Sequence, residues 1–215
     1  MYRLNFFEFE VVGDHKDVQM FINCRGDSTV YINNTKSNYT CEKFSVSNRD
    51  LVTIVFEENF SAEQFQGKDI FKWIKGSLPV INSYHIRYGF ADCRQLQFIP
   101  KTLLINNRLV KDLGHLFKNC HNLKTLREDL FTLNDQVEDF SNCFERCNSL
   151  TSIPPNLFAK NLKATNFNKT FANCEKLLLV PSSLFSHLNN IKTAKDCFLN
   201  FKGIGPLPII KCTDG

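Results

Sequence analysis

The sequence predicts an α+β fold, in which a small N-terminal antiparallel β domain precedes a solenoid of stacked repeats. Phenylalanine recurs every 27 residues, as Phe90, Phe117, Phe144, Phe171 and Phe198. Cysteine follows three residues later, as Cys93, Cys120, Cys147 and Cys174. A period of about 20 to 29 residues is typical of leucine-rich repeats, whose units bury their apolar faces only by stacking. The chain of 215 residues is therefore expected to hold a leucine-rich-repeat solenoid of about four 27-residue repeats.

The β domain is predicted over residues 1–60. Short runs rich in β-branched and aromatic residues alternate there with turn-forming Gly, Asn and Asp. Five such runs are expected to be strands: Leu4–Phe6, Val18–Ile22, Ser28–Ile32, Lys43–Val46 and Leu51–Phe56. Runs this short, separated by turns, favour a small antiparallel sheet or sandwich.

Residues 61–87 are predicted to be a cap and linker. Ser61 is a suitable helix N-cap, polar residues follow it, and Phe65, Trp73 and Ile74 come next. We expect a short amphipathic segment at about 61–76, and we expect it to cover the open end of the repeats, because stacked repeats need capping to stay soluble.

The solenoid is predicted over residues 88–202. Each Phe-x-x-Cys-x-x-Leu segment fits one helical or tight turn. In the third unit, Leu150–Pro154 resembles a short strand, Pro155–Phe158 a second helical turn, and Ala164–Phe167 a second short strand. The period stops at Gly203, so residues 203–215 are predicted to form a C-terminal cap.

The cysteine column is predicted to consist of buried, reduced thiols. The chain has nine cysteines, an odd number. Equivalent residues of neighbouring coils have parallel side-chain directions about 4.8 Å apart, which a disulfide cannot use. We expect these thiols to behave as small hydrophobes without hydrogen-bond partners. A serine hydroxyl at Cys147 would then cost about 1 to 3 kcal/mol, more than an alanine.

Composition and charge exclude several classes of function. The N-terminus has Glu8 and Glu10 where an export signal would be apolar, and no apolar run is long enough for a membrane span. Residues 1–80 carry 9 Lys and Arg against 11 Asp and Glu (net −2), and residues 81–215 carry 17 against 11 (net +6). This mild basic charge argues against nucleic-acid binding. No metal-ligand spacing, phosphate loop or catalytic constellation is apparent, so we expect no metal, no cofactor and no enzymatic activity.

The repeat resembles a known family. The segment Thr170–Phe185, with its F-x-x-C-x-x-L-x-x-V-P-x-x-L-F pattern, is similar to the BspA-like leucine-rich repeats of Bacteroidetes surface proteins and of phages that infect those bacteria. The resemblance covers residues 88–202 and departs from the pattern at Arg127, where proline would be expected, and at 101–116. It implies adhesion or protein interaction and transfers no catalytic residues.

Three functional hypotheses follow from this resemblance. The first is a phage virion or tail-associated protein, assembled in the bacterial cytoplasm in several copies, that contacts virion neighbours or the host surface. The absence of an export signal favours it. The second is a bacterial cell-surface adhesin that lacks its export signal, and the third is a cytoplasmic interaction scaffold. All three require a protein or surface-glycan partner.

The partner-binding residues are predicted between the Leu and Ile columns. Each coil has two variable residues there, and at least one of each pair should face outward. They are polar in the middle coils but apolar at Phe98, Leu178 and Leu179. We expect the contact on this ladder, with Lys124 steering an acidic partner. Alternatively, residues 206–210 fold over the two leucines.

Overall fold

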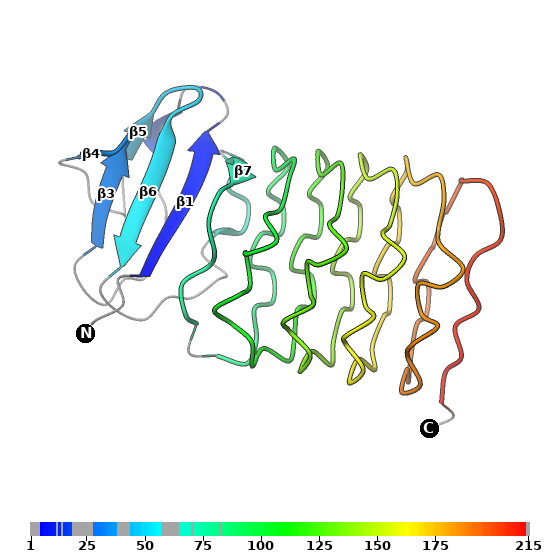
Figure 1. Cartoon of the computed structure of the whole chain (residues 1–215). Coiled ribbons are helices and arrows are strands. Elements are labelled where there is room, and N and C mark those ends of the chain that lie inside the picture. Colours follow the sequence, from blue (N-terminus) through cyan, green and yellow to red (C-terminus); the bar gives the residue numbers. More distant parts are fainter. Residues whose placement is uncertain are drawn as a thin grey trace.

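The computed structural model describes residues 5–11, 13, 15–18, 28–37, 44–56, 65–69, 71–81 and 83–213. A twisted β-sheet lies at the N-terminal end, and a regular stack of coils extends from it to the C-terminus (Figure 1). Buried apolar residues of the sheet and of the stack form one continuous core. We call residues 71–213 the coil stack.

The N-terminal sheet is antiparallel, with strand order β4-β3-β6-β1-β7. Side chains alternate along β1: Phe7 and Phe9 are buried, whereas Glu8 and Glu10 are partly exposed on the other face. Strands β2 and β5 form a separate two-stranded sheet. The strand bounds are β1 Asn5–Val11, β2 His15–Val18, β3 Ser28–Ile32, β4 Thr35–Lys36, β5 Phe44–Val46, β6 Leu51–Phe56 and β7 Phe71–Ile74.

The predicted strands largely agree with those of the sheet. β3 and β6 have the predicted bounds, β5 lies within its predicted run, and β1 continues well beyond the predicted Leu4–Phe6. β2 begins earlier than predicted, and residues 19–22 lie outside the described part. β4 was not predicted.

The predicted amphipathic cap instead contains a strand. β7 pairs with β1 through Phe9↔Ile74 and Glu10↔Trp73, so its backbone extends the sheet to the first coil. Ser61, the predicted N-cap, lies outside the described residues.

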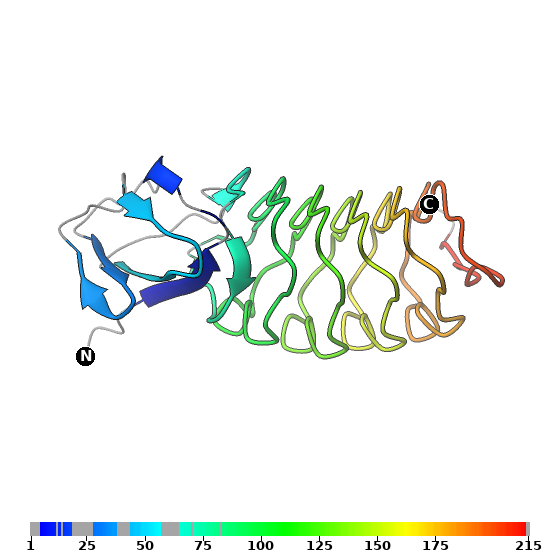
Figure 2. The ribbon, with the colours of Figure 1, turned by 90° about the horizontal axis from the view of Figure 1, so that it is seen from above.

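The coil stack repeats one backbone pattern every 27 residues. Successive coils lie side by side along the stack (Figure 2). Parallel bridges join neighbouring coils at two places, which fall in the predicted short strands. One column of bridges links His85, Asp112, Asp139, Asn166 and Thr193 in sequence, and bridges also join Trp73 to Phe98 and Ser152 to Leu179. Each bridge involves a single pair of residues, so the coils carry bridges and turns rather than full strands.

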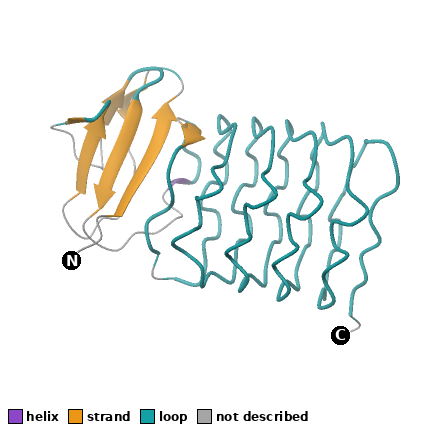
Figure 3. Ribbon diagram, viewed as in Figure 1, coloured by secondary structure: helices purple, strands orange, loops and turns teal. Residues whose placement is uncertain are grey.

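The prediction of an α+β fold with a leucine-rich-repeat solenoid is wrong. Within the described ranges, regular structure consists of β-strands, bridges and a short 3₁₀ turn at Phe65, and no α-helix is present. The coils that follow β7 are drawn throughout as loops and turns in Figure 3. Where helical turns were predicted, tight turns occur, and residues four apart in each coil have positive φ. The two columns are Tyr88, His115, Asn142, Lys169 and Asp196, and Asp92, Asn119, Arg146, Asn173 and Asn200. Two left-handed residues, four positions apart in each coil, prevent a helix from continuing through this segment.

Backbone hydrogen bonding is a second reason why no helix forms. In the coil that begins at Asp112, alternate N–H groups donate to the next coil and to the local turn. Leu113, His115, Phe117 and Asn119 donate to the carbonyls of Asp139, Ser141, Cys143 and Glu145, while Leu116, Lys118 and Cys120 donate three residues back. In this segment, half of the backbone N–H groups therefore bond to the adjacent coil instead of closing helical turns.

Replacing Lys169 with glycine is expected to stabilise the protein. Lys169 is exposed, has φ 54° and donates its N–H to the Lys195 carbonyl, a bond that glycine keeps. Relief of left-handed strain should exceed the entropic cost of glycine by about 0.5 to 1 kcal/mol. Urea unfolding measures the change. Lys160→Gly, in an exposed turn without positive φ, is the control and should destabilise; a loss of stability in Lys169→Gly would contradict the assignment of strain.

A single column of phenylalanine rings runs through both parts of the molecule. Phe90, Phe117, Phe144, Phe171 and Phe198 stack with ring centroids 5.4 to 5.8 Å apart and planes within 10° of parallel. Phe65 continues the column at 5.3 Å from Phe90, and Phe7 of β1 lies 4.3 Å beyond Phe65. The N-terminal sheet is thus packed directly onto the first coil.

Buried asparagines form a second column inside the stack. The Nδ2 group of Asn134 donates to the carbonyls of Leu104 and Asn107, at 3.3 and 3.0 Å. Asn161 repeats the contact on the coil of Asn134, at 3.2 Å and 2.8 Å. Both residues are at most 1% exposed. These amides satisfy carbonyls that turn into the core, where water cannot reach them.

The cysteine column is buried, as predicted, and its members are free thiols. Burial raises the pKa of each thiol, to about 12 for Cys174. The expectation that these thiols lack partners is wrong. Each Sγ donates to a backbone carbonyl of the preceding coil: Cys93 to Phe65, Cys120 to Phe90, Cys147 to Phe117 and Cys174 to Phe144, at 3.0 to 3.3 Å.

These contacts reverse the expected order of substitutions at Cys147. A serine hydroxyl can donate to the Phe117 carbonyl, as the buried Thr170 hydroxyl does to the Phe140 carbonyl at 3.1 Å in a neighbouring column. We expect Cys147→Ser to cost about 1 kcal/mol and no more than Cys147→Ala, which leaves a small cavity. Urea unfolding of both variants gives the comparison; a serine variant clearly less stable than the alanine variant would contradict it.

Candidate interaction surface

One column of outward-facing residues runs along the stack from β7, through the positions of the Trp73–Phe98 and Ser152–Leu179 bridges. We call it the ladder face; it comprises Trp73, Gln97, Phe98, Lys124, Thr125, Thr151, Ser152, Leu178, Leu179 and Ile204. Two buried columns flank it in every coil, for example Leu177 and Val180 on either side of Leu178 and Leu179. Because the two buried side chains fix the backbone, both residues between them point outward.

The ladder residues proposed from sequence are exposed. Lys124 and Thr125, Thr151 and Ser152, and Leu178 and Leu179 are exposed as pairs, and Phe98 is 38% exposed beside a partly exposed Gln97. Backbone hydrogen bonds connect these positions from coil to coil, including Lys124 N–H to Gln97 and Leu178 N–H to Thr151. The structure therefore brings Phe98, Lys124, Leu178 and Leu179 onto one face.

The N-terminal end of the ladder face is aromatic. Trp73 is 41% exposed and meets Phe98 edge to face, with ring centroids 5.5 Å apart. The Nζ atom of Lys72 lies 5.9 Å from the centre of the Trp73 ring. Sequence reasoning missed Trp73 as a surface residue. Strict alternation along β7 would place Trp73 on the face of the buried Phe71, but the register against β1 shifts between Glu10 and Val11, and Trp73 pairs with the partly exposed Glu10.

The C-terminal end of the ladder face is aliphatic. Leu178 and Leu179 are 58% and 56% exposed, and Ile204, whose N–H donates to the Leu178 carbonyl, is 73% exposed. Gly203 permits this approach, since a Cβ there would lie 2.2 Å from the Leu178 oxygen. The C-terminal segment thus adds one more step to the ladder and leaves the two leucines exposed, although Pro208 is buried.

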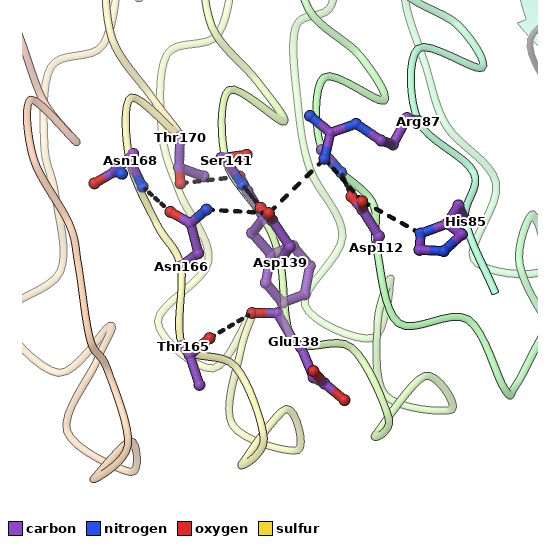
Figure 4. A network of polar contacts seen from close by, with 12 residues as sticks. His85, Arg87, Asp112, Glu138, Asp139, Ser141, Thr165, Asn166, Asn168 and Thr170 are labelled. Atoms are coloured by element: carbon purple, nitrogen blue, oxygen red, sulfur yellow. Dashed lines mark hydrogen bonds and ion pairs between the residues drawn. The ribbon is translucent and has the colours of Figure 1, made fainter. Parts of the chain in front are cut away.

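Another side of the coils carries a polar column (Figure 4). A guanidinium nitrogen of Arg87 lies 2.8 Å from the Asp112 carboxylate and 3.9 Å from that of Asp139, and its hydrogen bond with Asp112 raises the Arg87 pKa. Asn166 donates to Asp139 at 3.0 Å.

The same side chains also close local turns. The carboxylates of Asp112 and Asp139 accept the N–H groups of Gly114 and Ser141. Because its members satisfy one another, this column is explained by the stacking of turns.

Three further observations concern the described part of the chain. It contains no group of three or more His, Cys, Asp or Glu side chains placed to hold a metal ion. No helical stretch within the described ranges could span a membrane. Two shallow hollows open on the surface, one lined in part by Arg127, Glu128 and Lys160, the other by Ile105, Arg108 and Leu109.

Comparisons with protein-family models, curated proteins and solved structures found no match for the chain.

Proposed function

We propose that this chain is a non-catalytic protein-interaction module that binds its partner through the ladder face. The observation that carries the proposal is the cluster formed by Leu178, Leu179 and Ile204, three exposed aliphatic side chains on adjacent steps of the stack. Exposed apolar residues that lie next to one another tend to mark interaction sites, whereas isolated ones do not.

Other exposed leucines provide the contrast. Leu133 and Leu162 are 43% and 54% exposed, but each is the one leucine of a polar column. The residues equivalent to Leu162 in the neighbouring coils, for example, are Asp135 and Asn189. The ladder face differs because its apolar residues gather at its two ends.

The cellular setting remains the one implied by the repeat resemblance. We propose a phage virion or tail-associated protein that contacts virion neighbours or the host surface. A bacterial cell-surface adhesin and a cytoplasmic scaffold are the alternative settings. In each of them the ladder face serves the same purpose, since a protein partner would cover its apolar ends.

Photo-crosslinking tests this function. The full chain carrying benzoylphenylalanine at Phe98 or Leu178 would be mixed with a bacterial envelope extract and irradiated. The matched control carries the same residue at Leu162, which is 54% exposed on another side. Covalent protein adducts at Phe98 and Leu178, and none at Leu162, are expected. Equal labelling at all three positions, or none, would refute the proposal.

A further inference from the structure

We propose that the protein bound by the ladder face is a second copy of this chain, docked with its coil stack antiparallel to the first. This inference rests on the proposed function. A twofold axis along the ladder strands, midway between the Thr125 and Ser152 steps, would relate the two copies. Such an interface is isologous, so the face must be complementary to its own reversed copy.

The apolar pattern of the ladder face meets this condition. In the antiparallel dimer, Phe98 of one copy lies opposite Leu179 of the other, and Thr125 lies opposite Ser152. One step further out, Trp73 of one copy meets Ile204 of the other. Each aromatic end thus covers an aliphatic end, and hydroxyl side chains meet at the centre. Apolar side chains that are 38% to 73% exposed in a single copy would become buried at both ends of the ladder face.

Charge follows the same symmetry. Three residues before the ladder, equivalent positions in the four coils are Arg94, His121, Asn148 and Glu175. Arg94 and Glu175 are exposed and occupy the first and fourth places of this column, and the exposed Lys202 follows Glu175 at the same spacing. An antiparallel second copy, whose twofold axis runs along the ladder strands, brings each Arg94 to a Glu175. Each Lys124 would meet Thr151, whose hydroxyl can accept a hydrogen bond.

The size of the surface predicts a weak dimer. Coils joined by parallel bridges lie about 4.8 Å apart at the ladder. Six steps, each with up to two exposed residues and the edges of their flanking neighbours, therefore cover at most on the order of 400 Å² per copy. Stable interfaces bury about 800 Å² per partner. The copies should accordingly associate reversibly, and association should be sought at about 100 μM rather than at nanomolar concentrations.

Analytical ultracentrifugation of the full chain over a concentration series tests the association. The unchanged chain is expected to shift reversibly from monomer to dimer. Leu179→Ser should weaken the dimer about tenfold, because it removes an apolar contact twice per dimer. Leu162→Ser, a change at a leucine of similar exposure, should leave dimerisation unchanged. Thermal melts of both variants confirm that they are folded.

Charge reversal tests the antiparallel register. Arg94→Glu and Glu175→Arg should each weaken the dimer, since each places like charges opposite one another twice. The double variant Arg94→Glu, Glu175→Arg should restore it. A net-charge effect would move the two single variants in opposite directions, so rescue by the double variant identifies the pairing itself.

Two outcomes would overturn this inference. A chain that stays monomeric throughout the series excludes self-docking, and a dimer that the double variant fails to rescue has another geometry. Neither outcome touches the proposed function: photo-adducts of Phe98 and Leu178 with a different protein would keep that function while identifying another partner.

Discussion

Deleting residues 1–76 is expected to abolish the cooperative unfolding of the coil stack and to make the remainder aggregate. Phe90, fully buried in the intact chain, would lose the stacked ring of Phe65. The first coil would also lose hydrogen bonds, from the Cys93 thiol to Phe65 and from the Gln97 N–H to Lys72. An apolar end exposed in this way favours association over folding.

Light scattering and a thermal melt of the fragment 77–215 give the measurement. Phe65→Ala in the full chain is a milder perturbation of the same junction. It should lower the free energy of unfolding by roughly 3 to 5 kcal/mol, as expected for a buried phenylalanine. Val80→Ala, at a half-exposed residue near the same junction, is the control and should cost little. A soluble, monomeric fragment with a cooperative melt would show that the N-terminal sheet is an independent domain and not a cap.

Asn134→Asp is the point substitution with the largest expected effect. It keeps the shape of the side chain but replaces the Nδ2 donor with an acceptor that faces the carbonyls of Leu104 and Asn107. The site is 1% exposed, so an introduced carboxylate would be buried without a partner. The loss at neutral pH should be roughly 3 to 5 kcal/mol, measured by urea unfolding.

The pH dependence of this variant provides an independent check. Burial should raise the pKa of the introduced carboxyl above its value in the unfolded chain. The neutral acid is then favoured in the fold, so the variant's stability deficit should be smallest near pH 4 and should grow as pH rises to 7. Asn190→Asp is the control: Asn190 donates to the Leu162 carbonyl from an exposed position. If both variants lose the same stability, burial is not the cause.

The repeat period, the buried columns and several strands could be predicted from the sequence. Strict recurrence of Phe, Cys and Leu indicates stacking because equivalent residues must occupy equivalent places. β3 and β6 were predicted correctly, since their β-branched runs are bounded by turn residues. Their position between two apolar columns predicted that at least one of Leu178 and Leu179 would be exposed, and both are.

The turn conformation inside each coil could not be predicted. Apolar residues at positions one, four and seven are typical of a helical face as well as of these turns. The left-handed residues that separate the two cases include Arg146, Lys169 and Tyr88, none of which is a residue that favours positive φ. The hydrogen bonds between coils impose that conformation, and they depend on contacts that a local sequence window does not contain.

Part of the candidate surface was missed for a related reason. Trp73 belongs to the ladder face only because β7 pairs with β1 and bridges to Phe98. A sequence pattern that suggests an amphipathic helix places Trp73 among core residues instead. Ile204 was likewise assigned to the terminal cap, whereas its N–H continues the ladder at Leu178.

The repeated hydrogen-bond pattern of the coils also bears on how such a chain could change length during evolution. Each middle coil offers its neighbour the same donors and acceptors that it receives, as the bridges from Asp112 to Asp139 and from Asp139 to Asn166 illustrate. Duplication or loss of a whole 27-residue unit therefore preserves every type of contact. A gain or loss of one residue would shift the left-handed positions and the buried thiols and asparagines together. Selection should accordingly tolerate the gain or loss of whole units and substitutions on exposed columns, but few insertions or deletions of other lengths.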